Sequence, residues 1–138
     1  MFATAFCAVI DVETGEVIYS NCGHNAPLLL RRGVAIDHLT PTGPPLAASA
    51  QATFRTSTRR LLAGDRLILF SDGVPEATSP AGAFFGDQRL ELTALEFAEA
   101  AARDLVRGIV DRVAEFESGS PRNDDIACLG VVYRGREA

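Results

Sequence analysis

Three aspartates stand at the ends of stretches that have the composition of buried strands, and these residues are the best suited to chemistry. Asp72 follows the apolar run Leu67–Phe70 after one serine, Ser71, and Asp124 and Asp125 directly precede the apolar stretch IACLGVV. If the two strands are antiparallel neighbours, their carboxylates emerge at one end of the sheet. Two or more carboxylates at a strand end form a hard-oxygen site suited to Mg²⁺ or Mn²⁺. The residue types therefore indicate a metal site.

Gly73, directly after Asp72, would allow a sharp backbone turn and a close approach to a ligand, because it has no Cβ. The adjacent Asp124 and Asp125 repel each other, and a bound cation would relieve that repulsion. The tripeptides SDG and NDD are also common in ordinary turns and caps. From local evidence alone, the turn interpretation stays open beside the metal site.

The framework for these residues is predicted to be mostly β-structure up to residue 70. Alternation and β-branched or aromatic content indicate strands over residues 4–11, 16–23 and 51–61 and a hairpin centred on Gly33. The run Leu67–Phe70 has no polar side, so this strand should be covered on both faces. Residues 41–50 contain three prolines and are predicted to form a loop.

After residue 85 the period of the apolar residues becomes helical. A short helix is expected to open at FGDQRLELTAL, followed by one long amphipathic helix from Glu96 to Glu117 and a final strand in DIACLGVVYR. The apolar stripe of the long helix consists of Ala98, Ala102, Leu105, Ile109, Val113 and Phe116. This order predicts an α+β fold over residues 1–138, a single domain with antiparallel sheets and helices packed outside.

Composition excludes several classes of protein. The chain has 138 residues, is 47% hydrophobic and carries a net charge of −5 without a basic stripe, which argues against nucleic-acid binding. No apolar stretch approaches the roughly 20 residues of a membrane span, and the first residues do not resemble a signal peptide. The odd number of cysteines, Cys7, Cys22 and Cys128, predicts reduced, buried thiols in a cytoplasmic protein.

Four motifs in series carry a family resemblance. The stretches GDRLILFSDGVPEA, FFGDQRL and PRNDDIACLGVVYR resemble the C-terminal half of the SpoIIE-type serine/threonine phosphatases, which belong to the metal-dependent PPM (protein phosphatase 2C) family. The start of the chain, through NCGHNAPLLLRR, is similar to the family stretch that pairs an F-x-T strand with an N-A-G-H-x-P turn. The resemblance implies a β-sandwich flanked by helices, with a two-metal site at one end.

The same resemblance assigns roles to individual residues. Asp72 and Asp124 match two metal ligands of the family, whereas Asp125 shapes the turn, with a swapped role left open. His24 and Asn21 lie where other branches carry a carboxylate for an accessory metal, so they are expected at the rim of the site beside Gly73. The alternative is that Asn21 and His24 only hydrogen-bond a turn. His38 receives no role.

The implied reaction is hydrolysis of phosphoserine or phosphothreonine on a regulatory protein, such as an anti-sigma-factor antagonist. Two Mn²⁺ or Mg²⁺ ions would activate a bridging water for attack on phosphorus.

A D-x-x-G-x-G motif, whose Asp bridges the two metals in the family, is absent from the 138 residues. We therefore expect an incomplete domain whose N-terminal part is missing, either as a fragment or by gene truncation. Such a chain would bind at most one ion, be weakly active or inactive, and self-associate through uncovered sheet surface. The alternatives are a non-catalytic protein-binding domain that retains the phosphatase fold, and an unrelated α+β binding domain with coincidental turn motifs.

Overall fold

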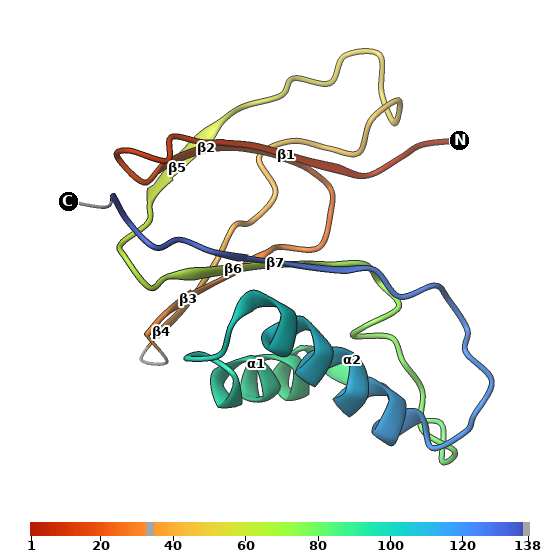
Figure 1. Cartoon of the computed structure of the whole chain (residues 1–138). Helices are drawn as coiled ribbons and strands as arrows, with labels where there is room; N and C mark the ends of the chain where they lie inside the picture. Colours follow the sequence, from red (N-terminus) through yellow and green to blue (C-terminus); the bar gives the residue numbers. More distant parts are fainter. Residues whose placement is uncertain (33–34, 137–138) are drawn as a thin grey trace.

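The computed structural model describes residues 1–32 and 35–136, which form two antiparallel sheets and two helices (Figure 1). The first sheet has the order β1–β2–β5 and consists of β1 (Ala5–Ile10), β2 (Glu16–Cys22) and β5 (Ser57–Arg60). The second sheet has the order β4–β3–β6–β7 and consists of β3 (Leu28–Arg31), β4 (Ala35–His38), β6 (Arg66–Phe70) and β7 (Cys128–Val132). The predicted α+β sandwich is confirmed.

Helices α1 (Gly86–Glu96) and α2 (Ala102–Glu117) both lie on the outer face of the second sheet, so the layers run sheet, sheet, helices. The interface between the two sheets and the interface between the second sheet and the helices each have their own hydrophobic core. The core between the sheets contains Val17, Tyr19, Leu29, Leu39, Leu61 and Leu67. The core between the second sheet and the helices includes Leu28, Leu30, Ile68, Phe70, Leu90, Leu105, Ile109 and Val113.

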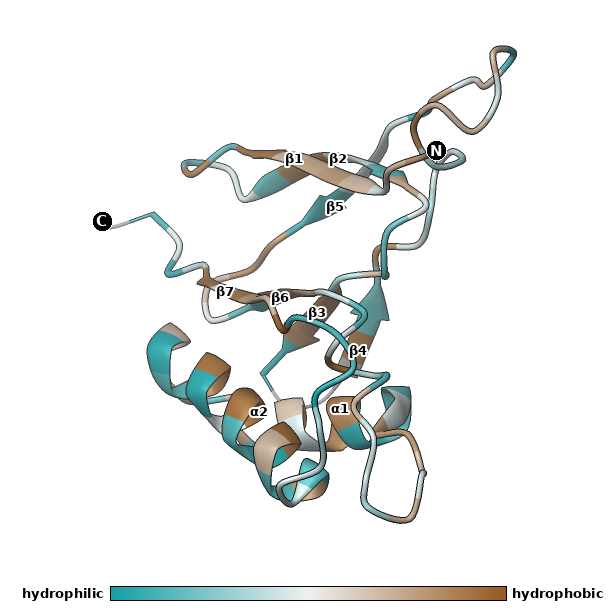
Figure 2. Ribbon diagram, turned by 90° about the vertical axis from the view of Figure 1, so that its right-hand side faces the viewer, coloured by the Kyte–Doolittle hydropathy of each residue, from teal (hydrophilic) through white to brown (hydrophobic). Residues whose placement is uncertain are grey.

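Strand β6 lies at the centre of both cores. Leu67 faces the first sheet, whereas Ile68 and Phe70 face the helices, and none of the three is more than 5% exposed. The expectation that this strand is covered on both faces is therefore confirmed. Figure 2 shows the brown, apolar sides of α1 and α2 turned toward this sheet.

Both predicted helices are present, but the long one begins at Ala102 and not at Glu96, because residues 97–101 separate α1 from α2. The buried guanidinium of Arg66 donates from Nε and NH2 to the carbonyl oxygen of Ala100, at 3.1 and 2.8 Å. Arg66, on β6, therefore holds the backbone of a residue 34 positions later in the chain, two residues before α2 begins. Ala98, predicted on the helical stripe, is buried in this connection instead.

Other predicted elements are present in the structure but differ from the prediction in length. The strand expected over residues 51–61 is present only as β5, Ser57–Arg60. The second hairpin is confirmed by the antiparallel pairing of β3 and β4, while Gly33 lies outside the described residues. No helix in the described ranges combines the length and hydropathy that a membrane crossing requires.

The prediction that all three thiols are buried is wrong for Cys7. Alternation along β1 turns Phe6, Ala8 and Ile10 toward the second sheet and leaves Cys7 exposed on the opposite face. Cys22 is buried and Cys128 is half-buried beneath α2. All three thiols are free.

The environments of the thiols predict different reactivities. Burial raises the pKa of the Cys128 thiol from the ordinary 9.0 to about 11. Because the folded-state pKa lies above the unfolded one, burial of the neutral thiol stabilises the fold below pH 9, and this contribution is lost as the pH rises toward 11. At about pH 8, iodoacetamide should modify Cys7 in the native chain and spare Cys128, since the thiolate is the reactive form. Mass spectrometry of digested samples checks this, with chemically denatured protein as the control in which all three react.

Candidate metal site at the end of strands β6 and β7

The ends of β6 and β7 are held together beyond the last residues of the sheet. The strands are antiparallel, with Phe70 opposite Cys128. The Ser71 amide donates to the Ala127 carbonyl oxygen at 2.9 Å, and the Ser71 hydroxyl donates to the Asp125 carbonyl oxygen at 3.1 Å. The same hydroxyl accepts from the Ala127 amide at 2.9 Å. The two acidic segments therefore leave the sheet side by side, as the proposed neighbouring strands require.

Gly73 makes this close approach sterically feasible. Gly73 is buried, and a Cβ built at this position would collide with the carbonyl oxygen of Asp125 and come within 3.3 Å of the Ile126 side chain. The space that a Cβ of Gly73 would fill is occupied by the backbone of the neighbouring segment. A glycine at this position thus keeps the segments after β6 and before β7 in contact.

The two candidate ligands are exposed carboxylates, and each has one oxygen in a hydrogen bond. Asp72 Oδ1 accepts from Asn25 Nδ2 at 2.6 Å. Asp124 Oδ1 accepts from the backbone amide of Asp125 at 2.8 Å, which shapes the turn that enters β7. Sequence reasoning missed Asn25, although it lies in the NCGHNAP stretch, because nothing local showed that its amide reaches a residue 47 positions away.

Asn21 and His24 stabilise the turn after β2. Asn21 is fully buried, and its Nδ2 donates to the Leu39 carbonyl oxygen at 2.9 Å while its Oδ1 accepts from the His24 amide at 2.8 Å. The ring Nδ1 of His24 lies 3.2 Å from the Thr4 hydroxyl. These contacts agree with the turn interpretation of both residues, and the side chain from this turn that contacts Asp72 is Asn25.

Two carboxylates lie on the joined segments after β6 and before β7, and carboxylate oxygens are of the type that a hard cation binds. Asp72 and Asp124 supply carboxylate oxygens from adjoining strand ends, which Mg²⁺ and Mn²⁺ accept together with water. Within residues 1–32 and 35–136, however, no three acidic, histidine or cysteine side chains form a group that could hold a metal. A pocket of about 130 Å³ beside Asp124 is lined by Gly73, Glu117 and Arg122, and Arg122 is paired with Glu117 at 3.1 Å.

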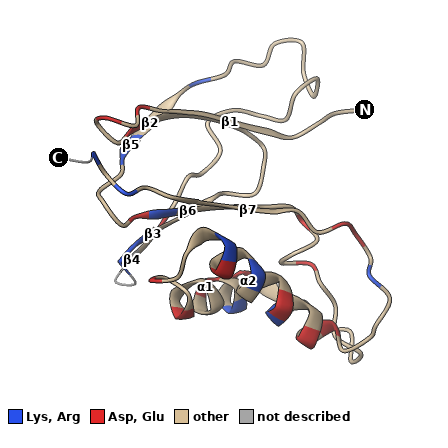
Figure 3. Ribbon diagram, in the orientation of Figure 1, with Lys and Arg blue, Asp and Glu red and all other residues tan. Residues whose placement is uncertain are grey.

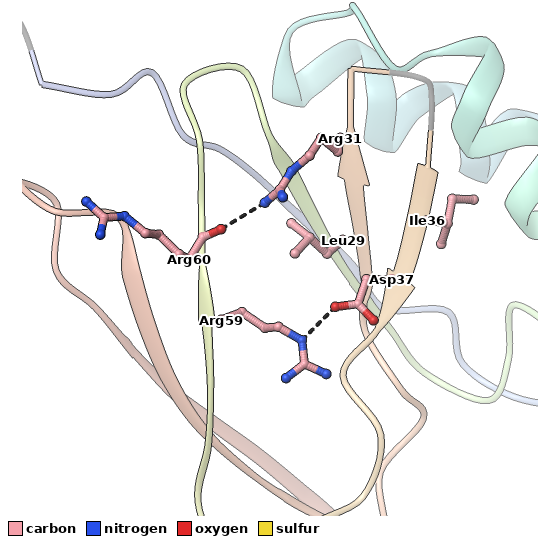
Figure 4. A pocket seen from close by; sticks show the side chains of 6 residues that line it. All are labelled: Leu29, Arg31, Ile36, Asp37, Arg59 and Arg60. Atoms are coloured by element: carbon pink, nitrogen blue, oxygen red, sulfur yellow. Dashed lines mark hydrogen bonds and ion pairs between the residues drawn. The ribbon is translucent and has the colours of Figure 1, made fainter.

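A larger pocket of about 280 Å³ lies away from the candidate ligands, between β5 and the β3–β4 hairpin (Figure 4). Arg59 Nε donates to Asp37 at 2.6 Å across it, and Arg31 NH2 donates to the Arg60 carbonyl oxygen at 2.8 Å. Partial burial raises the pKa of Asp37, but the hydrogen bond and positive charge of Arg59 outweigh it and lower that pKa. This pocket is bridged by contacts between the sheets and contains neither Asp72 nor Asp124.

Comparison with known proteins agrees with this architecture. The family model described as Stage II sporulation protein E (SpoIIE) matches residues 1–134. Protein IcfG of Synechocystis sp. is 36% identical over 137 residues, which cover 97% of this chain and 21% of IcfG. The family resemblance drawn from the motifs is thereby confirmed.

Two solved structures share the fold at low identity. The SiaA-PP2C domain of Pseudomonas aeruginosa has a TM-score of 0.82 and 18% identity, with 94% of this chain and 51% of that chain covered. The phosphatase domain of SpoIIE from Bacillus subtilis has a TM-score of 0.76 and 17% identity, with coverage of 98% and 60%. The chain therefore spans about a fifth of its curated relative and little more than half of these two structures.

Proposed function

We propose, since the chain belongs to the SpoIIE family, that residues 1–138 carry one part of a metal-dependent protein phosphatase site. The observation that carries the proposal is the joining of the β6 and β7 ends, which sets Asp72 and Asp124 on adjoining segments. Relatives of the chain include PP2C-type phosphatase domains. The proposed substrate is phosphoserine or phosphothreonine on a cytoplasmic regulatory protein, such as an anti-sigma-factor antagonist.

In this proposal Asp72 and Asp124 hold Mn²⁺ or Mg²⁺. When bound, the metal supplies Lewis-acid chemistry and an acidified water. Asn25 fixes one oxygen of Asp72 through its 2.6 Å hydrogen bond and so orients the other. Gly73 keeps the two ligand-bearing segments together. His24, Asn21 and Asp125 shape the turns that border the site.

Two observations on relatives support a hard divalent cation. One structure of the Bacillus subtilis SpoIIE phosphatase domain is described as Mn presoaked, and RsbX is described in complex with magnesium. At most one ion is proposed for this chain on its own, since no three acidic, histidine or cysteine side chains of the described residues group together. A second ion would need a further carboxylate, such as that of a D-x-x-G-x-G motif.

The isolated 138-residue chain should therefore hydrolyse phosphoserine peptides or an aryl phosphate very poorly with Mn²⁺, because a single ion lacks the paired activation of water. The test compares this chain with a version extended by upstream coding sequence that carries a D-x-x-G-x-G motif, and turnover should appear only in the extended protein. Robust Mn²⁺-dependent turnover by the 138 residues alone would contradict the incomplete site. An extended protein that remains inactive yet captures a protein partner would favour the alternative of a non-catalytic binding domain.

A further inference from the structure

The two proposed metal ligands are held in different ways. The Asp72 carboxylate accepts a hydrogen bond from Asn25, whose side chain comes from a separate turn of the chain. The Asp124 carboxylate accepts from the amide of the next residue, Asp125, which lies in the same loop. A bond within the loop does not fix the loop itself relative to the sheet. The position of Asp124 therefore depends on the contacts that anchor the segment between α2 and β7.

This segment, residues 118–127, is neither helix nor strand, and contacts with other parts of the chain hold it. Asn123 Nδ2 donates to the Thr78 hydroxyl at 3.0 Å, which joins the segment to the chain after β6. Nearer to β7, the Asp125 carbonyl oxygen accepts from the Ser71 hydroxyl at 3.1 Å. Figure 3 shows acidic and basic residues together along this connection. One of these charges forms a further anchor, to α2.

That anchor is the ion pair between Glu117, the last residue of α2, and Arg122. Arg122 NH2 donates to Glu117 Oε1 at 3.1 Å, and the Glu117 side chain is only 7% exposed. A buried carboxylate is costly unless it is paired, and the helix dipole opposes a negative charge at the C-terminal end of a helix. The last turn of α2, with the sequence AEFE, supplies no basic residue of its own. The charge of Glu117 is therefore balanced from the loop that carries the metal ligand.

The ion pair lies beside the proposed metal ligand. One small pocket is lined by both partners of the pair, by Gly73 and by Asp124. Ser118 and Gly119 have positive φ angles of 50° and 84°, and this left-handed backbone ends the helix and turns the chain back. Arg122 can therefore reach a residue five positions earlier, and the loop is fixed at the helix end before it arrives at Asp124.

We propose that Glu117 and Arg122 are positioning residues for Asp124, an inference that rests on the proposed function. The ion pair fixes the start of the loop on α2, the Ser71 bond fixes its end beside β6, and Asp124 is held between these two points. Loss of either partner of the pair releases one end of the loop, so the carboxylate is no longer held in place for the ion. Neither Glu117 nor Arg122 is itself a proposed ligand.

Isothermal titration of the 138-residue chain with Mn²⁺ tests the proposal. Arg122→Gln and Glu117→Gln should each lower the Mn²⁺ affinity about tenfold, the lower end of the range for the loss of a supporting contact. The shared direction is decisive, because a through-space effect alone would make Arg122→Gln bind Mn²⁺ more tightly by removing a positive charge near the cation. Arg122→Lys keeps a cation that pairs with Glu117, so it should retain most of the affinity.

A second ion pair of α2 supplies the matched control. Arg112 NH2 lies 2.7 Å from Glu96 Oε2 and joins the two helices, and Arg112→Gln should bind Mn²⁺ as the parent chain does. Without metal, hydrogen exchange measured by mass spectrometry should be faster across residues 118–127 in Arg122→Gln and Glu117→Gln than in this control. Circular dichroism establishes that all variants fold.

The outcomes separate this inference from the proposed metal site. If Asp124→Asn lowers the Mn²⁺ affinity but Arg122→Gln leaves it unchanged or raises it, the positioning role is wrong and the metal site stands. Unchanged hydrogen exchange across residues 118–127 in both glutamine variants would also overturn the positioning role. If the parent chain binds no Mn²⁺, or Asp124→Asn binds it as tightly as the parent, the metal site fails and this inference fails with it.

Discussion

Replacement of Asp72 by Asn is expected to abolish most of the Mn²⁺-dependent phosphatase turnover of the extended protein and to weaken Mn²⁺ binding by the 138-residue chain. A neutral amide removes the negative charge that a hard cation requires and leaves one weaker oxygen donor. Asp124→Asn should act in the same direction. Isothermal titration with Mn²⁺ measures the loss of binding independently of turnover.

Asn25 provides a graded test of the same site. It contacts Asp72 but is not itself a proposed ligand, and the loss of such a supporting hydrogen bond costs about 10–100-fold in metal affinity. Asn25→Ala should therefore fall between the parent chain and Asp72→Asn. Asp104→Asn, on an exposed aspartate of α2, is the control that should bind Mn²⁺ normally. Equal affinity in Asp72→Asn and the parent would remove Asp72 from the site.

Leu105→Ala is expected to lower the free energy of unfolding by about 2–5 kcal/mol, because it empties space in a fully buried position between α2 and the second sheet. Unfolding by urea, monitored by circular dichroism, measures the change. Parent and variant are compared at one protein concentration, so that any self-association affects both measurements alike.

The exposed Leu92 supplies the matched control. Leu92→Ala removes the same atoms from a side chain that is 56% exposed, so its cost should stay within about 0.5 kcal/mol. A loss below that value for Leu105→Ala would mean that the apolar stripe of α2 does not form the core contact described here.

Local sequence patterns were sufficient to predict many of the strands and the buried side of α2. Alternation predicted β1 and β2, and the wholly apolar run Leu67–Phe70 predicted a strand covered on both faces, because side-chain periodicity reflects which face meets the core. Leu105, Ile109 and Val113 were assigned to the buried stripe for the same reason, and all three are fully buried. Gly73 was predicted to let the backbone approach a ligand, and in the structure the close neighbour is the backbone of Asp125.

The differences arise where contacts between distant residues decide the structure. Helical periodicity continued through residues 97–101, but Arg66 binds the Ala100 carbonyl oxygen there and the helix begins afresh. Cys7 lies in an apolar strand, yet its exposure depends on which layer covers that face of the first sheet.

The amino-acid sequence by itself determined the strand types, the buried stripe of α2 and the placing of Asp72 and Asp124 at strand ends, since these follow from short-range periodicity. The tertiary structure alone decided that β6 and β7 are neighbours and that Asn25 rather than Asn21 or His24 contacts Asp72. The physical reason is that a hydrogen bond or a strand pairing depends on where the packed layers bring residues far apart in the chain, which no local pattern encodes.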